Sequence, residues 1–356
     1  MWPAGISITG TGNYIQIRHN KIHNINNGEN GALGLAVYGT NAPSSINNLI
    51  IDGNELYGLV LGDSESLTLN GNVQFWSVTN NVVRDNNNIG IDAAGFWKVA
   101  PNPAYDQARD GYIGGNVVYN IHQASTNGAD GIYVDGGTRI TIEKNIIHNC
   151  DIGLEAASEN PGRTSSYVTA RSNLIFLNLT AGVSLGGYST GVGSTDHTTV
   201  VNNTLFHNDT SSSGSGELLL QYFPDTVSSN TFDNNIVAAG PQGLLIGNDF
   251  SDPVVSLDNN LYYAPNGNPN NNTWMWANAT YQKFSAYKAA SGNDSTSSFA
   301  NPQFVNLIVP ILWVQSTSPA INAGTNLGTA VVGTQDVAGF PRVQGADIDI
   351  GAYEQG

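Results

Sequence analysis

An asparagine that opens a short apolar segment recurs nine times along this chain, as in NNVVRD and KNIIHN. Successive copies are 25 to 35 residues apart. The nine positions are Asn20, Asn54, Asn81, Asn116, Asn145, Asn173, Asn203, Asn235 and Asn260. A repeat of this period is typical of a solenoid, in which each coil buries its apolar face against its neighbours. The repeat therefore predicts about nine stacked coils.

Two short strand patterns flank each asparagine. An alternating, β-branched segment precedes it, as in YIQIRH and RITIEK. A second segment follows about ten residues later, with the copies GLAVYG, GLVLGD, GIDAAG, GIYVDG, GLEAAS, GVSLGG, ELLLQY and GLLIGN. Strands this short pair in parallel with their copies one coil later, and an asparagine at each bend can hydrogen-bond the asparagines above and below it. We therefore expect an all-β parallel β-helix with a structural asparagine ladder.

On this repeat, the chain resembles the right-handed parallel β-helix proteins of the pectate-lyase-like superfamily, including bacterial polysaccharide-active members. The resemblance covers about Ile6 to Tyr263. It implies a right-handed helix, a polysaccharide partner and a secreted or cell-surface location. The superfamily contains lyases, hydrolases, adhesins and non-catalytic carbohydrate-binding modules, so the fold alone does not decide the chemistry.

The periodicity fades in the last quarter of the chain. We assign residues 1–263 to the parallel β-helix and residues 264–356 to a C-terminal segment packed on the solenoid within the same structural domain. A short helix is expected at about 281–290. The tail is expected to cap the last open sheet edge, and Arg342 has three candidate partners, Asp336, Asp347 and Asp349.

The front of the chain enters a coil at Gly5 without a helix or polar strand to cover the first sheet edge. As a hypothesis, we expect other domains of a larger chain beside it. The opening segment, MWPAGISITG, lacks a signal-peptide pattern, and no run of roughly eighteen apolar residues predicts a membrane span. The net charge of −16 argues against a nucleic-acid partner.

Alternation along the second strands places one group of side chains outside the core. If Ile91, Ile132, Leu154 and Val183 point inward, the outward residues are Asp92, Tyr133, Glu155 and Ser184, with Asp135 two positions beyond Tyr133. We expect these residues to form an exposed acidic patch. The Cα atoms of Asp135 and Glu155 would be about 8 Å apart, a separation that suits the acid and base of an inverting glycosidase. Binding of sugar hydroxyls and simple solvation are the alternatives.

Long turns on the same coils predict walls for a groove. Aromatic rings can stack on sugars, and charged side chains can reach their hydroxyls or carboxylates. The predicted substrate-binding residues are Asp92, Trp97, Lys98, Arg109, Tyr133, Asp135, Glu155, Glu159, Arg163, Tyr188 and Tyr222.

Lyase chemistry needs a base beside the sugar C5 atom and a neutraliser for the uronate. The resemblance implies a Lys or Arg base on the strand face, where this chain has none; Tyr133 would serve only with a lowered pKa. A Ca²⁺ site from Asp130, Asp135 and Asp151 follows no motif, so no cofactor is predicted. The histidines, His23 and His148 included, are interpreted as structural, and Cys150 as a buried thiol.

The sequence therefore predicts recognition of a plant cell-wall polysaccharide such as xylan or pectin. The favoured hypothesis is a non-catalytic carbohydrate-binding module of a larger secreted enzyme. The alternative is a polysaccharide-degrading enzyme, either a glycoside hydrolase with Asp135 and Glu155 as catalytic residues or a uronate lyase.

Overall fold

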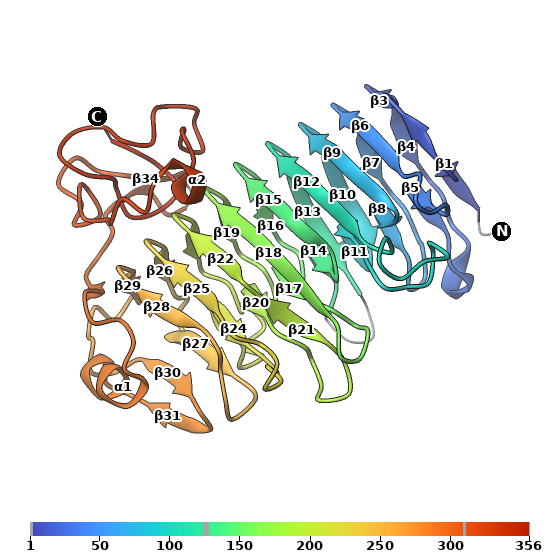
Figure 1. Ribbon diagram of the computed structural model, residues 1–356. Coiled ribbons are helices and arrows are strands. Elements are labelled where there is room, and N and C mark those ends of the chain that lie inside the picture. The colour runs from blue at the N-terminus through green and yellow to red at the C-terminus, as the bar shows by residue number, and fades with distance from the viewer. Residues whose placement is uncertain (1–2, 124–127, 309–310, 356) are drawn as a thin grey trace.

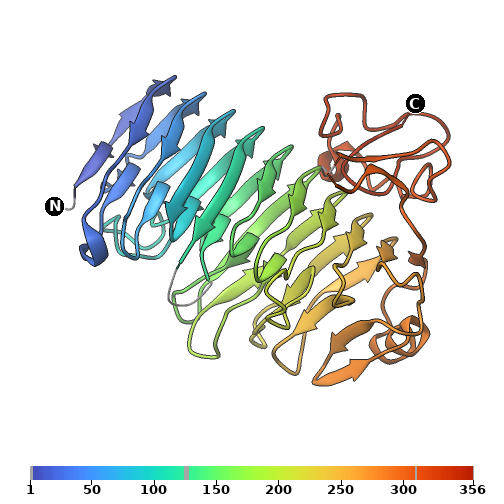
Figure 2. The same cartoon turned by 180° about the vertical axis from the view of Figure 1, so that it is seen from behind.

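The computed structural model describes residues 3–123, 128–308 and 311–355, and the chain winds into a right-handed β-helix (Figures 1 and 2). Three sheets run along its length, and each coil contributes a short strand to each sheet. The predicted fold class is confirmed. None of the helices in the described residues is long and apolar enough to cross a membrane.

Sheet A carries the second strand of each coil. Its order is β1 (Ala4–Thr9), β5 (Leu33–Gly39), β8 (Glu65–Gly71), β11 (Ile89–Ala93), β14 (Asp130–Asp135), β17 (Ile152–Ala157), β20 (Ala181–Leu185), β24 (Leu218–Leu220), β27 (Leu244–Asn248), β30 (Thr273–Trp276) and β31 (Ala279–Tyr281). Only β30 and β31 pair antiparallel in this sheet.

Sheet B carries the alternating strand before each ladder asparagine. Its order is β2 (Gly12–Asn13), β6 (Ile46–Asp52), β9 (Val73–Thr79), β12 (Ala108–Gly114), β15 (Thr138–Glu143), β18 (Thr164–Arg171), β22 (Thr198–Val201), β25 (Asn230–Asp233) and β28 (Ser256–Asp258). In addition, β3 (Gln16–Arg18) pairs with β6, and β21 (Ser194–Asp196) pairs with β18.

Sheet C begins just after each ladder asparagine. Its order from the C-terminal end is β32 (Ser298–Phe299), β29 (Leu261–Tyr263), β26 (Ile236–Ala238), β23 (Thr204–Phe206), β19 (Leu174–Phe176), β16 (Ile146–His148), β13 (Val117–His122), β10 (Val82–Asn87), β7 (Glu55–Tyr57) and β4 (Lys21–His23). The remaining elements are the 3₁₀ helix η1 (Gly28–Asn30), α1 (Phe284–Ser291), the hairpin β33 (Phe304–Asn306) and β34 (Ile311–Val314), and α2 (Thr329–Val332).

The predicted asparagine ladder is confirmed between sheets B and C. The backbone N–H and the side-chain amide of Asn145 both donate to Oδ1 of Asn173, at 2.9 and 3.0 Å. Its own Oδ1 accepts the same two bonds from Asn116, and its amide also donates to the Ile113 carbonyl. Side-chain bonds of this kind link the asparagines from Asn20 to Asn260. Each bend therefore satisfies polar groups that would otherwise be buried without partners.

A left-handed residue precedes every ladder asparagine. These residues are His19, Gly53, Asn80, Gly115, Lys144, Ser172, Asn202, Asn234 and Asn259, with φ between 52° and 66°. A single left-handed residue turns the chain sharply from sheet B into sheet C. Six of the nine are Gly or Asn, the residue types that adopt this conformation most easily.

Side chains at matching positions of sheet A stack inside the solenoid. Ile91 pairs with Ile132, Ile132 with Leu154, and Leu154 with Val183, and all four side chains are fully buried. Cys150 is also buried. The ring of His148 stacks between Tyr119 and Phe176, and the ring of His23 stacks on Tyr57.

One predicted strand is wrong. The segment GLVLGD, residues 58–63, does not enter sheet A, and Val60 forms only an isolated bridge with Asn26. Gly58 and Gly62 both have φ near +65°, so the backbone turns at each end of the apolar string. The strand of this coil in sheet A is β8, which begins with Glu65.

The C-terminal segment does two separate jobs. The hairpin of β30 and β31 continues sheet A, and α1 packs on it, with Trp274 stacked on Phe284 and Tyr287. These residues cap the end of the core (Figure 1).

The tail beyond residue 300 packs on the side of the solenoid instead of sealing its end, which corrects the sequence-based expectation. Phe304, Leu312 and Ile350 bury the outer face of sheet C in one apolar cluster with Phe206 and Leu261. The reason is that sheet C presents apolar side chains outward on its later coils.

Arg342 anchors this tail through a partner that the sequence analysis did not name. Its Nη1 lies 3.3 Å from a carboxylate oxygen of Glu354, and its Nη2 donates to the Ser172 hydroxyl and the Ala352 carbonyl. The charges of Asp336 and Asp349 act on it electrostatically. Arg342 is thus buried and paired, as a guanidinium in an apolar setting must be.

Candidate functional site

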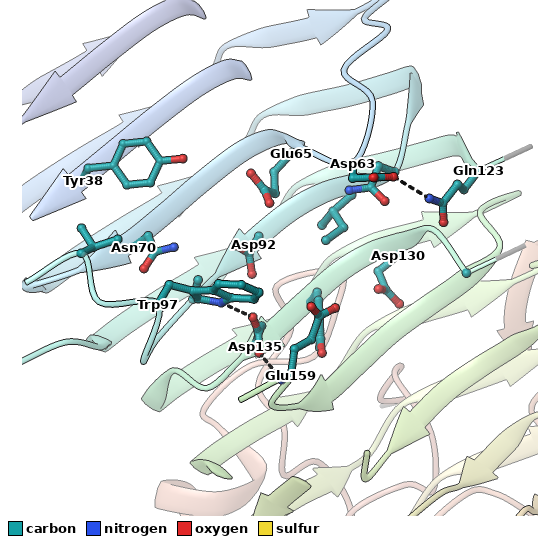
Figure 3. Close-up of a pocket in the computed structure, with 16 residues that line it drawn as sticks. Tyr38, Asp63, Glu65, Asn70, Asp92, Trp97, Gln123, Asp130, Asp135 and Glu159 are labelled. Atoms are coloured by element: carbon teal, nitrogen blue, oxygen red, sulfur yellow. Dashed lines mark hydrogen bonds between the residues drawn. The ribbon is translucent and has the colours of Figure 1, made fainter. Parts of the chain in front are cut away.

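An acidic pocket lies on the outer face of sheet A, over β5, β8, β11 and β14 (Figure 3). Its volume is about 540 Å³. Six of its lining residues carry carboxyl groups: Asp63, Glu65, Asp92, Asp130, Asp135 and Glu159. Its other polar or aromatic lining residues are Tyr38, Asn70, Asn88, Trp97, Gln123 and Tyr133. No lysine, arginine or histidine is among the described residues that line it.

Strand register brings part of the predicted site together as expected. Asp92 pairs with Tyr133, Tyr133 with Glu155, and Glu155 with Ser184, so these residues form one row across four coils. Asp135 lies two positions beyond Tyr133 on β14. The predicted register of this row is therefore confirmed.

The prediction that this row is exposed is wrong. Asp92 is 3% exposed, Tyr133 and Asp135 are each 4% exposed, and Glu155 is 6% exposed. The connections at residues 94–107 and 158–163 fold over the sheet and supply Trp97 and Glu159 to the pocket wall. The row therefore lies at the bottom of a pocket and not on an open wall.

Asp135 is held from two sides by hydrogen-bond donors. Its Oδ2 accepts the indole N–H of Trp97 at 2.5 Å, and its Oδ1 accepts the backbone N–H of Glu159 at 2.7 Å. Figure 3 shows both bonds at the pocket wall. The carboxyl group therefore has a fixed orientation, supported by the two covering loops.

Asp92 and Asp130 each keep a buried oxygen without a hydrogen-bond partner. Oδ2 of Asp92 accepts the Thr68 hydroxyl at 2.9 Å, whereas its Oδ1 has no partner. Oδ1 of Asp130 also lacks a partner. Buried polar atoms are paired in the great majority of cases, so two unpaired carboxyl oxygens in one pocket indicate a site that is built for something other than stability.

The pKa values of the pocket carboxyl groups are raised. Burial, followed by the charge of Asp135, raises the pKa of Glu65 to about 7. Burial raises the pKa of Asp135 to about 7 as well, against the lowering effect of its hydrogen bonds. Burial and the charges of Glu65 and Asp135 hold the pKa of Asp92 well above its usual range. Glu65 and Asp135 therefore exchange protons near neutral pH.

Glu155 occupies a different environment from the one predicted. It does not line the pocket, and the Ser184 hydroxyl donates to its Oε1 at 3.3 Å. Burial raises its pKa to about 7. Burial and then the charge of Glu155 hold the pKa of Asp130 well above its usual range. Glu155 therefore lies behind Asp130, a residue of the pocket wall, and Asp135 alone of the predicted catalytic pair lines the cavity.

Two predicted cations line a second pocket. Lys98 and Arg163 face a cavity of about 580 Å³ on the other side of the covering loops, together with Phe96 and Asp106. Arg109 lies elsewhere, on β12 of sheet B, where it donates to side-chain oxygens of Asn72 and Gln74 and to backbone carbonyls.

The two remaining predicted tyrosines lie outside the acidic pocket. Tyr188 is 58% exposed, and its partial burial and then the charges of Glu159, Asp135 and Glu155 raise its pKa. Tyr222 pairs with Gly187 in an isolated bridge and packs edge-on against Phe250.

The structure gives Tyr133 no role as a lyase base. Burial and the charges of the surrounding carboxylates hold its pKa well above its usual range, whereas a base needs a lowered pKa. The proposed Ca²⁺ ligands also diverge. Both oxygens of Asp151 are engaged, by His122 and by the backbone N–H groups of Gln123 and Ala129. Within the described part of the chain, no group of three or more His, Cys, Asp or Glu side chains is arranged to hold a metal ion.

Sequence reasoning missed Glu65, Asp63, Tyr38 and Asn70 as pocket residues. Glu65 was overlooked because the sequence analysis aligned GLVLGD, and not ESLTLNG, with the sheet A strands of the other coils. With the correct alignment, Thr68 pairs with Asp92, and Glu65 falls at the start of the same row of strands. The alternating pattern of ESLTLNG was the available signal.

Comparison with known proteins fits this architecture. The model of the right handed beta helix region matches residues 74–280. The chain belongs to the right-handed β-helix family. An uncharacterized member from Bacillus subtilis (strain 168), YwoF, is 39% identical over 308 residues, which make up 84% of this chain. This β-helix protein spans 64% of the length of that relative.

Two solved structures resemble this β-helix protein in fold. Pectate lyase Pel9A aligns with a TM-score of 0.52 and 14% identity, over 100% of this chain and 89% of that chain. The Dettilon tailspike protein gp208 aligns with a TM-score of 0.51 and 13% identity, over 75% of this chain and 50% of that chain. Identities this low show a shared fold, so the chemistry has to be argued from the pocket.

Proposed function

We propose that the protein hydrolyses a neutral polysaccharide bound in the acidic pocket, with Glu65 and Asp135 as the acid–base pair. The observation that carries this proposal is the group formed by Glu65, Asp92 and Asp135 on three neighbouring strands of the pocket floor. Burial and neighbouring charges raise the pKa of Glu65 and of Asp135 to about 7 and hold the pKa of Asp92 well above its usual range. Carboxyl groups that exchange protons near neutral pH suit general acid and base catalysis.

Accessibility and hydrogen bonding assign the two roles. Glu65 is partly exposed in the pocket, so a bound glycosidic oxygen can reach its protonated carboxyl group. Its proton passes to the leaving sugar oxygen as the glycosidic bond breaks. Asp135, which its two donors favour in the ionised form, takes a proton from the water that attacks the anomeric carbon. The products are two shorter glycans, one with a new reducing end.

Asp92 is a positioning residue in this scheme. It lies between Glu65 and Asp135, and burial and the charges of both raise its pKa. Changing the charge at Asp92 should therefore shift the pH at which Glu65 and Asp135 exchange their protons. In this scheme Asp92 helps the other two carboxyl groups to supply one acid and one base at the same pH.

The charge of the pocket favours a neutral substrate. Six carboxyl groups and no lining cation among the described residues would repel a polyuronate unless a metal ion bridged it. Neutral backbones such as those of xylans therefore fit better than pectin. The exposed ring of Trp97 at the rim, 46% exposed, provides a face on which a sugar ring can stack.

Several features support a polysaccharide as the ligand in general. The protein shares its fold with a pectate lyase, and its pocket lies on a long parallel sheet along which a polymer can extend. A plant cell-wall source, a secreted location and membership of a larger enzyme are part of this proposal. A non-catalytic carbohydrate-binding module is the second candidate, favoured by the exposed rings of Trp97 and Tyr188.

A panel experiment tests the proposal. Xylans, β-glucans, pectin and alginate are screened by affinity gel electrophoresis, and each is assayed for new reducing ends and for unsaturated products absorbing at 235 nm. We expect binding of a neutral glycan and release of reducing ends, with a rate maximum near pH 7. Binding without products would support the non-catalytic candidate, and absorbance at 235 nm would overturn hydrolysis in favour of elimination.

Three amide variants separate the roles. Glu65→Gln and Asp135→Asn are each expected to lower kcat by at least about 10²-fold while binding is retained. Asp92→Asn is expected to move the pH profile and to leave substantial activity. Glu155→Gln serves as the matched control, because Glu155 is buried like Asp92 and Asp135 and carries a raised pKa but does not line the pocket. Loss of kcat in Glu155→Gln alone would overturn the assignment of the pair.

A further inference from the structure

The second pocket lies back to back with the acidic pocket, across the same two loops. Along one loop, Trp97 and Val99 line the acidic pocket while Phe96 and Lys98 line the second pocket. On the other loop, Glu159 lines the acidic pocket and Arg163 the second. Because residues adjacent in sequence line the two cavities, the cavities lie on opposite sides of the same loops.

The two cations of this pocket form no ion pair within the described residues, a property that they share with Arg109, Lys144, Lys283 and Lys288. The protein has 12 Lys and Arg residues against 28 Asp and Glu residues. Six of these cations form salt bridges with carboxylates: Arg18, Lys21, Arg84, Arg139, Arg171 and Arg342. Among the described residues, Lys98 and Arg163 pair with no carboxylate, although they share one cavity.

The geometry keeps both cations available. The guanidinium of Arg163 lies 4.8 Å from the ring centroid of Phe96, a stacking contact that fixes its plane and leaves its N–H groups at the edges. Asp106 is the only acidic residue among the described residues that line this pocket. Its two carboxylate oxygens accept backbone N–H groups, from Lys98 at 2.6 Å and from Ala100 at 2.8 Å. The cavity therefore presents two positive charges whose nearest carboxylate is already engaged.

Two left-handed residues direct the side chains of this loop into different pockets. Phe96 and Lys98 both have positive φ, 68° and 61°, a conformation that other non-glycine residues of this chain also adopt at bends. The Asp106 carbonyl accepts the N–H of Phe96, and its carboxylate accepts that of Lys98. Phe96 and Lys98 thereby line the second pocket, whereas Trp97 between them lines the acidic pocket.

We propose that this second pocket binds the carboxylate of an acidic branch on the glycan whose neutral backbone occupies the acidic pocket. The inference rests on the proposed function and narrows its substrate class to neutral backbones that carry uronic-acid branches. A planar carboxylate matches the fork of the stacked Arg163, and Lys98 adds a second charge. The two pockets thus divide the ligand by charge.

Affinity measurements with two related polymers test this inference. The full chain is titrated with neutral arabinoxylan and with glucuronoxylan at low salt, and a sulfated galactan forms a third arm. We expect at least a tenfold preference for glucuronoxylan over arabinoxylan, which 0.5 M NaCl removes. The double substitution Lys98→Gln with Arg163→Gln should reduce glucuronoxylan affinity to the neutral level and leave arabinoxylan binding unchanged.

The control is Lys283→Gln with Lys288→Gln, which removes the same charge near α1, away from both pockets. Equal binding of the two xylans by the unmodified protein, or a preference that persists in the Lys98/Arg163 variant, would overturn the inference and leave the proposed function intact. Failure to bind either xylan would count against the proposed function itself. A stronger preference for the sulfated galactan would overturn the carboxylate assignment.

Discussion

The asparagine ladder and the acidic pocket are two rows of buried polar residues on one solenoid, and they treat hydrogen bonding in opposite ways. In the ladder, Asn145 uses its amide and its oxygen fully, with the asparagines of both neighbouring coils. In the pocket, Asp92 and Asp130 each bury an oxygen without a partner. The ladder stabilises the fold, whereas the buried carboxyl groups of the pocket lower its stability when they are charged. Identical spacing along a solenoid therefore does not imply an identical role.

The two rows also differ in how burial acts on them. A buried amide is neutral and needs only partners, which the repeat supplies at every coil. A buried carboxyl group loses its hydration and responds by holding its proton, as the pKa values near 7 of Glu65 and Asp135 show. The pocket gains reactivity from the same burial that gives the ladder its stability.

Replacing a ladder asparagine with aspartate should lower the free energy of unfolding more than any other change considered. In Asn145→Asp, the side-chain donor to Asn173 and Ile113 becomes an acceptor that faces other acceptors. We expect a loss of about 3–5 kcal/mol in the free energy of unfolding, typical for an uncompensated buried charge. Urea unfolding followed by circular dichroism measures it. Asn149→Asp, an exposed site on the same coil, is the control, and a similar cost there would erase the distinction.

The second largest effect should be the pH dependence of stability that the carboxyl groups of the pocket cause. Glu65, Asp135 and Glu155 have folded pKa values raised to about 7, so the folded state binds more protons than the unfolded state between about pH 4 and pH 7. Their contribution is fully present below the unfolded pKa values and is lost as pH rises through 7. We expect Tm to fall between pH 5 and pH 8 by several degrees in thermal scans. A Tm that rises across this range would contradict the raised pKa values.

The reverse substitution in the pocket, Asp92→Asn, should change the free energy of unfolding by less and should raise it. It removes a buried charge that Glu65 and Asp135 repel, and an amide can still accept the Thr68 hydroxyl. Because the folded pKa of Asp92 is raised, the cost of its charge grows as pH rises, so we expect a gain of about 1–2 kcal/mol at pH 8 and a smaller gain at pH 5. Urea midpoints at the two pH values measure it. A loss of stability at pH 8 would place Asp92 with the structural residues.

The ladder was predictable from sequence and much of the pocket was not, for the same physical reason. Each ladder asparagine acts through its own bend and the next coil, so a local pattern records it. The left-handed residue before each asparagine was not predicted, although Gly53 and Gly115 at two of these positions were a signal for it. The outward row through Asp92 and Glu155 was predictable because strand alternation and register are local as well.

The burial of that row depends on the path of loops that follow no repeat. Residues 94–107 and 158–163 cover the sheet through contacts such as that of Trp97 with Asp135, 38 residues away. Arg342 likewise pairs with Glu354 instead of its three predicted partners, because the tail packs on sheet C. Side-chain contacts between non-repeating segments leave no periodic signal, so these features appear only in three dimensions.

The smallest expected effect tests how far the hydrogen bonds of the pocket tune its chemistry. Trp97→Phe keeps an aromatic face for the sugar and removes the indole N–H that lowers the pKa of Asp135. With that donor lost, the pKa of Asp135 rises further, so the acidic limb of the kcat profile should move to higher pH by less than about one unit. Rates of reducing-end release from pH 5 to pH 9 measure the shift.

The control is Tyr188→Phe, at the exposed rim. It should leave the acidic limb of the kcat profile in place, because within the described residues Tyr188 donates no hydrogen bond to Asp135. If Trp97→Phe moves the limb to lower pH, or Tyr188→Phe moves it equally, Asp135 is not the base and the pocket loses the feature that separates it from the ladder.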